Sequence, residues 1–411
     1  LFWHGYFTSS QQDVKSSYQM IEQNQMLRSS ALGSFRELLH GAAKDPAMLE
    51  YLDNDENKKS SPNENFAREV MELFTLGEGN YTEDDIKEAA RAFTGWRARK
   101  SEFVSSGRQH DDGTKTILGV TGKLGGEDVL DILLDQPACA TYVAGRIVTY
   151  LEGVEPAPER LARYADLLRA ADYELEPMLR ELFLDPEFYR DEVVGQRIAG
   201  PVDLLVGMAR RLELEPPTVW YTSGSQLLGQ RLFHPPSVKG WDEGMAWITT
   251  ASLMQRGNLA GILVGAVDAS EVLSDTDEMF QGEEMMDMEG EAMEATAGRV
   301  KGLKLGALGG FKAMDGRWNP DLNLSGGLRR ARAATPESAV DYLADTLLAV
   351  ELGPGTRAML VEEYARLRAE GQRARESERS GRFRQRARRG DEDALRRFVH
   401  LLLSLPEAQL H

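Results

Sequence analysis

The residues best suited to chemistry lie on one predicted helix that follows Ser61. Asn65, Arg68, Glu69 and Glu72 fall at i, i+3, i+4 and i+7, which places them in a polar stripe beside an apolar one. Two carboxylates on one helix, joined by a histidine from elsewhere, can hold a metal ion or divide the roles of general acid and general base. An ion pair between Arg68 and Glu72 explains the same spacing without any chemistry, and the spacing alone favours that interpretation.

Further candidates lie in three other places. His4 is flanked by aromatic residues, a setting in which histidine is more often a hydrogen-bonded core residue than a ligand or a base. His110 and Asp111 fall at a predicted turn, where aspartate is expected for the turn itself. The loop around Lys239 and Trp241 contains two prolines and a glycine, and its lysine is suited to bind an anion or to lie over the tryptophan ring.

These observations give two sets of candidates. The candidates for catalysis are Glu69, Glu72, His4, His110 and Asp111, and the candidates for ligand binding are Asn65, Arg68, Lys239 and Trp241. A divalent metal ion is a cofactor that such carboxylates and histidines would allow. No GxGxxG, Walker A, HExxH or GxSxG motif occurs, so the common signatures of nucleotide-binding proteins, zincins and α/β-hydrolases are missing.

The elements that position these residues are mainly helical. Residues 61–64 (Ser-Pro-Asn-Glu) match a capping box with proline at the first helical position. The helix that follows has an apolar face and ends at Gly77; the face consists of Phe66, Val70, Leu73 and Phe74. Thr82 to Asp85 predicts the start of the next helix. Residues 102–104 and 116–118 flank the Asp111 turn, which predicts a small β-hairpin.

Helical periodicity continues along the remaining chain. Helices are predicted at 127–134, 138–152, 159–171, 176–184, 201–213, 224–230, 245–265, 336–350, 355–376 and 391–405. The predicted fold class is therefore mainly α, a multi-helical array with a small β-hairpin near residues 100–120.

Length and charge limit the functions that the chain can have. It has 411 residues, 66 acidic and 48 basic, and a net charge of −18. The length predicts two or three domains. The acidic balance argues against binding of nucleic acid or of an anionic membrane surface through bulk charge. No uninterrupted apolar run reaches the ~18 residues of a membrane span, and a single cysteine, Cys139, excludes an internal disulfide framework.

Composition divides the chain into three parts. Residues 1–265 form the predicted helical core, residues 266–327 an acidic insertion rich in Met and Glu with a Gly-rich connector, and residues 328–411 a C-terminal helical segment. Residues 268–294 contain no Lys or Arg and are best explained as a disordered or loosely helical insertion, although their methionines leave a Cu(I) site as an alternative. The Arg-rich residues 366–389 predict a solvated helix face or a docking site for an acidic segment.

Several stretches match a known pattern in the same order. They are Leu1–Phe7 (Leu-Phe-Trp-His-Gly-Tyr-Phe), residues 45–53, Pro62–Gly77, Ala92–Trp96, His110-Asp111 and Pro235–Trp241 with Trp247. Through these motifs the sequence resembles the large bacterial family called domain of unknown function 1800. The resemblance covers residues 1–265 strongly and residues 328–411 through a helical ending.

The resemblance implies a mainly helical, usually exported protein, located in the periplasm or outside the cell. Such proteins are often encoded beside an exported protein with a sulfatase-like fold, and the resemblance implies no reaction. The chain begins at Leu1 rather than Met, so any export signal is expected upstream of this sequence. The family often has a second histidine where this chain has Tyr6. If that pair binds a metal in relatives, this chain lacks one ligand.

Two hypotheses from different classes follow. The first is a helical scaffold that binds another exported cell-envelope protein, with a sulfatase-like protein as the expected partner. The alternative is a hydrolytic cell-envelope enzyme, with or without a metal ion, whose site would combine His4, the Glu69/Glu72 stripe, His110-Asp111 and Lys239. The replacement at Tyr6 favours the scaffold. Convergence of His4, Glu69, His110 and Lys239 in one cleft would favour the enzyme.

Overall fold

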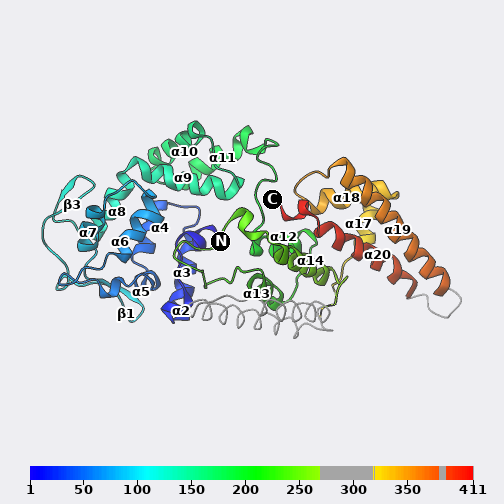
Figure 1. The fold of residues 1–411 in the computed structure, drawn as a ribbon, viewed down its shortest axis with the longest axis horizontal. Helices are drawn as coiled ribbons and strands as arrows, with labels where there is room; N and C mark the ends of the chain where they lie inside the picture. Colours follow the sequence, from blue (N-terminus) through cyan, green and yellow to red (C-terminus); the bar gives the residue numbers. More distant parts are fainter. Residues whose placement is uncertain (269–317, 319, 379–385, 411) are drawn as a thin grey trace, which may run out of the picture. The chain divides into compact units, whose positions relative to one another are not determined.

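The structure is a computed structural model that describes residues 1–268, 318, 320–378 and 386–410 (Figure 1). It confirms the predicted mainly helical fold, and its described residues include two small antiparallel sheets. The chain forms two compact units: unit 1 comprises Leu1–Val193 and Leu232–Trp241, and unit 2 comprises Val194–Arg231 and Asp242–His411. Apart from Asp268, the predicted acidic insertion at 268–294 lies outside the described residues. The predicted three-part division therefore stays a prediction.

Unit 1 contains the segments that carry all of the candidate residues. Its α-helices are α1 (Phe2–Tyr6), α2 (Gln11–Val14), α3 (Ser17–Ser29), α4 (Phe35–Ala43), α5 (Pro46–Tyr51), α6 (Asn65–Met71), α7 (Glu83–Ala92), α8 (Gly126–Asp135), α9 (Pro137–Glu152), α10 (Pro158–Ala170) and α11 (Leu175–Leu184). Two 3₁₀-helices, η1 (Asn54–Glu56) and η3 (Pro186–Tyr189), and a π-helix, η2 (Glu72–Leu76), complete its helical part. The helices predicted between residues 127 and 184 are confirmed with ends shifted by at most one residue.

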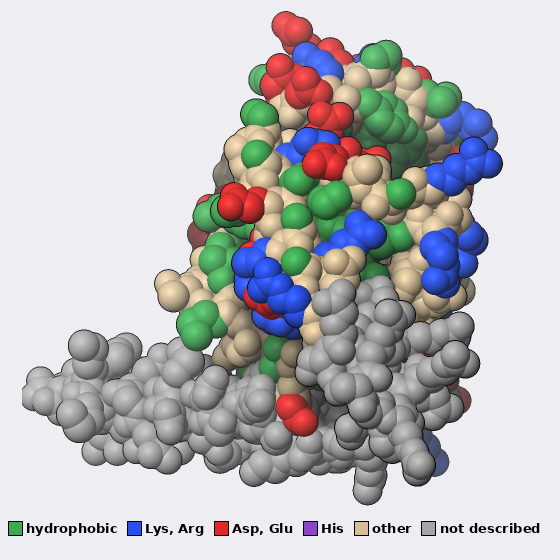
Figure 2. Space-filling model, turned by 90° about the vertical axis from the view of Figure 1, so that its right-hand side faces the viewer, with side chains coloured by type: hydrophobic (Ala, Val, Ile, Leu, Met, Phe, Trp, Pro, Cys, Tyr) green, Lys and Arg blue, Asp and Glu red, His purple; other side chains and the backbone are tan. Residues whose placement is uncertain are grey.

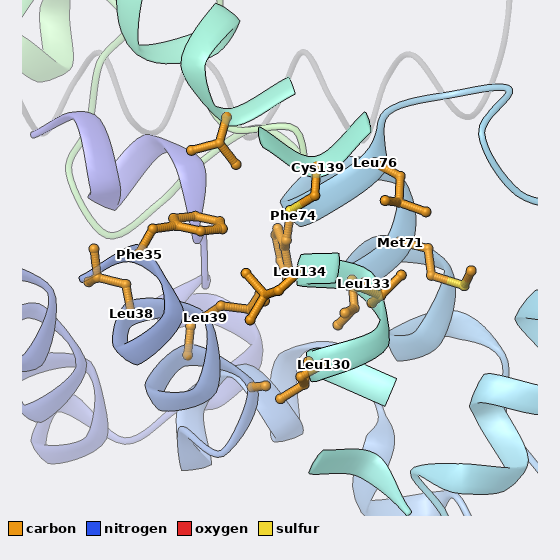
Figure 3. Close-up of a cluster of buried hydrophobic side chains, with 14 of the residues drawn as sticks. Phe35, Leu38, Leu39, Met71, Phe74, Leu76, Leu130, Leu133, Leu134 and Cys139 are labelled. Atoms are coloured by element: carbon orange, nitrogen blue, oxygen red, sulfur yellow. The ribbon is translucent and has the colours of Figure 1, made fainter. Parts of the chain in front are cut away.

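The core of unit 1 is built from apolar faces of helices that lie far apart in the sequence. Figure 3 shows side chains from α4, α6, η2, α8 and α9 pointing towards one another; they are Phe35, Leu38, Leu39, Met71, Phe74, Leu76, Leu130, Leu133, Leu134 and Cys139. Full burial of such a side chain contributes roughly 1.5–3 kcal/mol relative to its exposure. Burial also raises the pKa of the Cys139 thiol to about 12, so this cysteine is an inert core residue.

The strands of unit 1 pair differently from the prediction. β1 (Trp96–Arg99) pairs with β2 (Glu102–Ser105), and β3 (Lys115–Ile117) pairs with β4 (Val120–Gly122). Hairpin structure near residues 100–120 is therefore confirmed, but the pairing of residues 102–104 with 116–118 is wrong: residues 102–104 and 116–117 lie in strands of different hairpins, and Leu118 lies in a turn. Each strand turns back after two residues with positive φ, Lys100-Ser101 in one hairpin and Leu118-Gly119 in the other. Neither pair is Asn-Gly or Asp-Gly, the dipeptides that most strongly predict such turns from a sequence.

Unit 2 is all helical in its described part. Its α-helices are α12 (Pro201–Arg211), α13 (Thr218–Leu227), α14 (Thr250–Val264), α17 (Leu324–Arg330), α18 (Pro336–Leu347), α19 (Pro354–Glu378) and α20 (Arg386–Leu403). The 3₁₀-helices are η4 (Gly244–Trp247) and η5 (Pro406–Gln409). Arg256 of α14 is buried and donates to the Ala199 carbonyl (2.9 Å) and to Gln409 Oε1 (3.1 Å), which joins the start of α12 to η5. Burial lowers the pKa of Arg256 to about 10.

The surface of unit 2 mixes charges of both signs. On the face that Figure 2 shows, Lys and Arg side chains lie beside Asp and Glu side chains, with hydrophobic ones between them. Arg366 of α19 pairs with Glu363 (2.5 Å) and Glu370, and Arg357 pairs with Asp341 (2.7 Å). For the described part of residues 366–389, this agrees with a solvated helix face. Among the described residues, no helix is both long and apolar enough to cross a membrane.

Candidate functional site

The helix that carries the carboxylate stripe begins later than predicted. α6 starts at Asn65, and its preceding residue Glu64 makes no capping hydrogen bond, so the predicted capping box at Ser61 is wrong. Asn63 Oδ1 accepts the Asn65 backbone N–H (3.0 Å), and Asn57 Oδ1 accepts that of Asn63 (3.0 Å). These asparagines offer the backbone an alternative to helix, which delays the start of α6 by one turn. The Asn65 side chain itself donates to the Leu52 carbonyl (3.1 Å).

The stripe lies where the α-helix becomes a π-helix. α6 continues directly into η2 (Glu72–Leu76), whose wider turn leaves backbone carbonyls for other partners. The Tyr142 hydroxyl donates to the Leu73 carbonyl (3.1 Å), and the Tyr6 hydroxyl donates to the Phe74 carbonyl (2.9 Å). Tyr6 thus stabilises the π-helix from a buried position. π-helical turns occur frequently at functional sites.

The predicted ion pair between Arg68 and Glu72 is wrong. Arg68 makes two hydrogen bonds with Glu83 at the start of α7 (2.9 and 2.7 Å) and a longer one with Glu64 (3.5 Å). Glu72 accepts the Tyr81 hydroxyl instead (2.7 Å). A guanidinium group that donates to both oxygens of one carboxylate is favoured over one that makes a single contact. This explains why Arg68 pairs with Glu83 rather than with Glu72.

Glu69 combines partial burial with a charge from another segment. Burial raises its pKa, and the neighbouring Glu72 raises it further, whereas Arg68 and Lys239 lower it. Lys239 belongs to the same unit as α6, and its side chain is exposed to solvent.

The loop that carries Lys239 is fixed against the N-terminal segment of unit 1. Thr8 Oγ1 donates to the Val238 carbonyl (2.6 Å), and the Gln11 N–H donates to the Phe233 carbonyl (2.8 Å). Gly240 has φ +86°, and a Cβ there would lie 2.5 Å from the Gly5 carbonyl oxygen, so only glycine fits this approach. The N-terminal motif at Leu1–Phe7 and the loop motif at Pro235–Trp241, each of which contains candidate residues, therefore pack against each other.

His4 lies within this contact. Its Nε2 accepts the Phe233 backbone N–H (3.1 Å), and its ring centroid lies 4.9 Å from that of Phe233 and 5.2 Å from that of Trp241. Burial lowers the His4 pKa to about 4, so the ring is neutral near pH 7. Tyr6, on the same helix, packs instead against other rings, including Phe7 (4.9 Å). The two positions have different neighbours, which argues against their sharing one metal ion in this fold.

His110 and Asp111 lie in a separate environment. Asp111 accepts Arg91 Nε (2.8 Å), and the hydrogen bond from Arg91 lowers the Asp111 pKa to about 2. His110 Nδ1 lies 3.1 Å from the Thr94 carbonyl. The buried Lys115 donates to the Gly113 carbonyl (3.1 Å) in the same turn. Within the described part of the chain, no hydrogen bond, ion pair or ring contact joins His110 or Asp111 to the other candidates.

The candidates thus fall into two groups rather than one constellation. Glu69, Lys239, His4 and Trp241 are connected through the loop at 232–241, and His110 with Asp111 is not part of that group. Residues 1–268, 318, 320–378 and 386–410 contain no cluster of three or more His, Cys, Asp or Glu residues that could hold a metal ion. The same residues show no cation–π contact between Lys239 and Trp241.

Sequence reasoning missed an ion cluster that is almost fully buried. Arg160 of α10 pairs with Glu152 at the end of α9 (2.6 Å) and with Asp185 after α11 (3.1 Å), and these side chains are 7%, 0% and 5% exposed. The Tyr164 hydroxyl (2.8 Å) and Arg163 also donate to Asp185. The sequence signal was present only as isolated charges near helix ends, which are common on solvated surfaces.

Sequence reasoning also missed an exposed aromatic surface beside that cluster. The α11 patch consists of Phe183, Leu184, Phe188 and Tyr189, of which Phe183 is 43%, Leu184 71% and Tyr189 60% exposed. The Leu-Phe-Leu run at 182–184 was a signal for this surface. Three consecutive residues of a helix point in different directions, so one buried face cannot cover all three side chains.

Comparison with known proteins identifies the family. A family model described as "Protein of unknown function (DUF1800)" matches residues 1–410. The chain belongs to the DUF1800 family. Searches of curated proteins and of solved structures find no match. The DUF1800 match includes both the loop at 232–241 and the N-terminal helix that it contacts.

Proposed function

We propose that this DUF1800 chain is a non-catalytic helical scaffold that binds another exported cell-envelope protein in the periplasm or outside the cell. The expected partner is a sulfatase-like exported protein encoded beside it, as the family resemblance suggests. The observation that carries the proposal is the exposed α11 patch, which has the chemistry of a protein interface. Further support comes from the candidate catalytic residues, most of which make contacts that stabilise the fold.

The α11 patch is both aromatic and internally fixed. The Phe183 and Phe188 rings lie 5.3 Å apart and the Phe188 and Tyr189 rings 5.1 Å apart, both edge to face. The Tyr189 hydroxyl donates to the Phe183 carbonyl (2.8 Å), which ties η3 back to α11. Aromatic residues are enriched in the centres of interfaces because they bury large areas with few rotatable bonds. Such a group at the surface of a monomer indicates an interaction site.

Exposed charged residues flank the patch along the chain, and a polar rim of this kind is typical of interfaces. Arg180, Arg190 and Glu192 are exposed on the neighbouring turns. Below the patch, Asp185 accepts the Glu187 N–H (3.0 Å) and begins η3. The ion cluster around Asp185 therefore holds η3 in place, so the aromatic side chains are ordered before any partner arrives. Such preorganisation lowers the entropic cost of binding.

The candidate catalytic side chains mostly serve the fold. His4 accepts a backbone N–H, Asp111 is paired with Arg91, and Glu72 accepts a tyrosine hydroxyl. A general acid or base must reach a substrate proton, and groups already engaged in these contacts are poorly available for that role. This supports a scaffold rather than an enzyme.

The test measures affinity for the sulfatase-like partner by isothermal titration calorimetry. The Leu184→Ser variant removes an apolar side chain that is 71% exposed, and the matched control Leu32→Ser removes one that is 74% exposed elsewhere in unit 1. We expect a complex whose Kd rises at least ~10-fold with Leu184→Ser, equivalent to about 1.4 kcal/mol, and less than ~2-fold with Leu32→Ser. Absence of a complex with the wild-type chain, or equal losses in both variants, would refute the proposal.

A cell-envelope hydrolase is the second candidate, and one observation favours it. Glu69 has a raised pKa, lies at the junction with the π-helix and interacts electrostatically with Lys239. A carboxylic acid with a raised pKa is suited to general acid–base catalysis. Glu69→Gln keeps the side-chain shape and removes the charge, so it would abolish turnover in an enzyme and leave partner binding unchanged in a scaffold.

A further inference from the structure

The His4 ring has a defined tautomer. Because Nε2 accepts the Phe233 backbone N–H (3.1 Å), the proton of the neutral imidazole resides on Nδ1. His4 is only 5% exposed, and its Nδ1 finds no acceptor among the described residues. Buried N–H groups are nearly always paired, so this donor requires an explanation.

A second unpaired donor belongs to the same ring cluster. Trp241 is 9% exposed, its ring lies 5.2 Å from that of His4 at an angle of 45°, and its Nε1–H also lacks an acceptor among the described residues. Both N–H groups belong to rings that the loop contacts hold in place. Lys239, two residues before Trp241, adds an exposed positive charge to the same loop.

From this geometry we propose that His4 and Trp241 form a binding site for a carboxylate, with Nδ1–H and Nε1–H as donors and Lys239 as the neighbouring charge. Two neutral donors without an acceptor match the acceptor-only chemistry of a carboxylate. Hydrogen bonds to an ionised acceptor are stronger than neutral ones, and they offset part of the cost of removing the ligand from water. The site is separate from the α11 patch and does not depend on the proposed scaffold function.

The charge of Glu69 should weaken ligand binding at this site. The Glu69 carboxylate interacts with Lys239, so a bound carboxylate would compete with it for the same cation and be repelled by its charge. Glu69→Gln should therefore tighten carboxylate binding by roughly 3-fold, and Lys239→Gln should weaken it by a similar factor. A ligand without charge would respond to neither change.

The experiment follows the Trp241 indole N–H resonance by NMR of the full chain during titration with sodium acetate. Two substitutions separate the two nitrogens of His4. His4→Gln places an acceptor near the position of Nε2 and lacks the Nδ1 donor, whereas His4→Asn keeps a donor near Nδ1 and lacks the Nε2 acceptor. Tri-alanine with a free or an amidated C-terminus then distinguishes a small carboxylic acid from the end of a protein chain as the natural source.

We expect a saturable shift of the indole resonance in the wild-type protein, at least ~10-fold weaker binding in His4→Gln, and binding within ~3-fold of wild type in His4→Asn. Circular dichroism checks that each variant is folded, and Trp241→Phe assigns the resonance. Tighter binding of free tri-alanine than of acetate would assign the site to chain ends, and the reverse order to small acids. No saturable shift, an equal response in His4→Gln, or a crystal structure from acetate solution with only a water between the two nitrogens would overturn the proposal.

Discussion

The ion cluster around Arg160 gives the sharpest prediction about stability. Replacing Arg160 with methionine keeps most of the side-chain volume and removes the charge that Glu152 contacts at 2.6 Å. Asp185 retains Arg163, the Tyr164 hydroxyl and a backbone N–H, whereas the fully buried Glu152 side chain loses its partner. One uncompensated buried carboxylate costs about 3–5 kcal/mol.

This free energy translates into a large change in melting temperature. For a unit of this size, 1 kcal/mol shifts the Tm by roughly 2–4 °C, so Arg160→Met should lower the transition of unit 1 by roughly 6–20 °C. Arg180→Met is the matched control, because Arg180 and its partner Glu176 are 69% and 74% exposed. An exposed pair contributes at most ~1 kcal/mol, so the control should shift the Tm by less than ~4 °C.

Differential scanning calorimetry of the full chain at pH 7.5 provides the measurement. Equal melting of Arg160→Met and Arg180→Met at pH 7.5 would refute the reasoning. Such a result would mean that Glu152 finds another partner or contacts water.

Three further predictions concern the fold of unit 1. Burial raises the pKa of Asp45 to about 6, above its value in an unfolded chain, so stability due to this group is gained as the pH falls from 7 towards 4. Relative to Asp45→Asn, the wild type should gain up to about 3 kcal/mol over that range in urea denaturation; a pH-independent difference would contradict this. Tyr6→Phe leaves the buried Phe74 carbonyl unpaired and should cost about 1–3 kcal/mol by the same assay, whereas an unchanged midpoint would show that the hydroxyl is dispensable. Gly126→Ala brings a Cβ within 2.4 Å of the Trp96 ring and should lower the Tm by several degrees, and an unchanged Tm would show that the ring can move.

Local features of the fold could be predicted from the sequence because they depend on neighbouring residues. The helix start predicted at Thr82 to Asp85 is confirmed. A capping box forms there, with Asp85 N–H donating to Thr82 Oγ1 (3.2 Å) and Thr82 N–H donating to Asp85 Oδ2 (2.9 Å). Proline at the first position of α9, α10 and α12 likewise marks the true helix starts.

Helix α3 was not predicted because its sequence lacks the regular apolar spacing of a surface helix, and tertiary contacts stabilise it instead. It buries Gln19 and Gln23 together with apolar residues and exposes Tyr18 and Ile21, so its sequence shows no continuous apolar stripe. Gln23 is accommodated in the interior because its Nε2 donates to Ser9 Oγ (2.9 Å) and to Asp45 (2.8 Å). Partners so far along the chain cannot be inferred from periodicity.

The candidate site was predictable in its residues but not in its grouping. The sequence motifs selected both Glu69 and Lys239, and Lys239 lowers the pKa of Glu69. His110 lies apart from this group because the neighbouring Asp111 pairs with Arg91. The spacing of residues in the sequence does not predict that ion pair. The assignment of any role to these residues stays a prediction.

The most direct test of the scaffold function compares two variants in one titration against the sulfatase-like partner. Leu184→Ser alters the α11 patch, and Glu69→Gln alters the carboxylate that an enzyme would need. The scaffold account predicts that Glu69→Gln binds the partner with the affinity of the wild type and that Leu184→Ser raises the Kd at least ~10-fold. Wild-type affinity in Leu184→Ser, together with a loss of binding in Glu69→Gln, would contradict it.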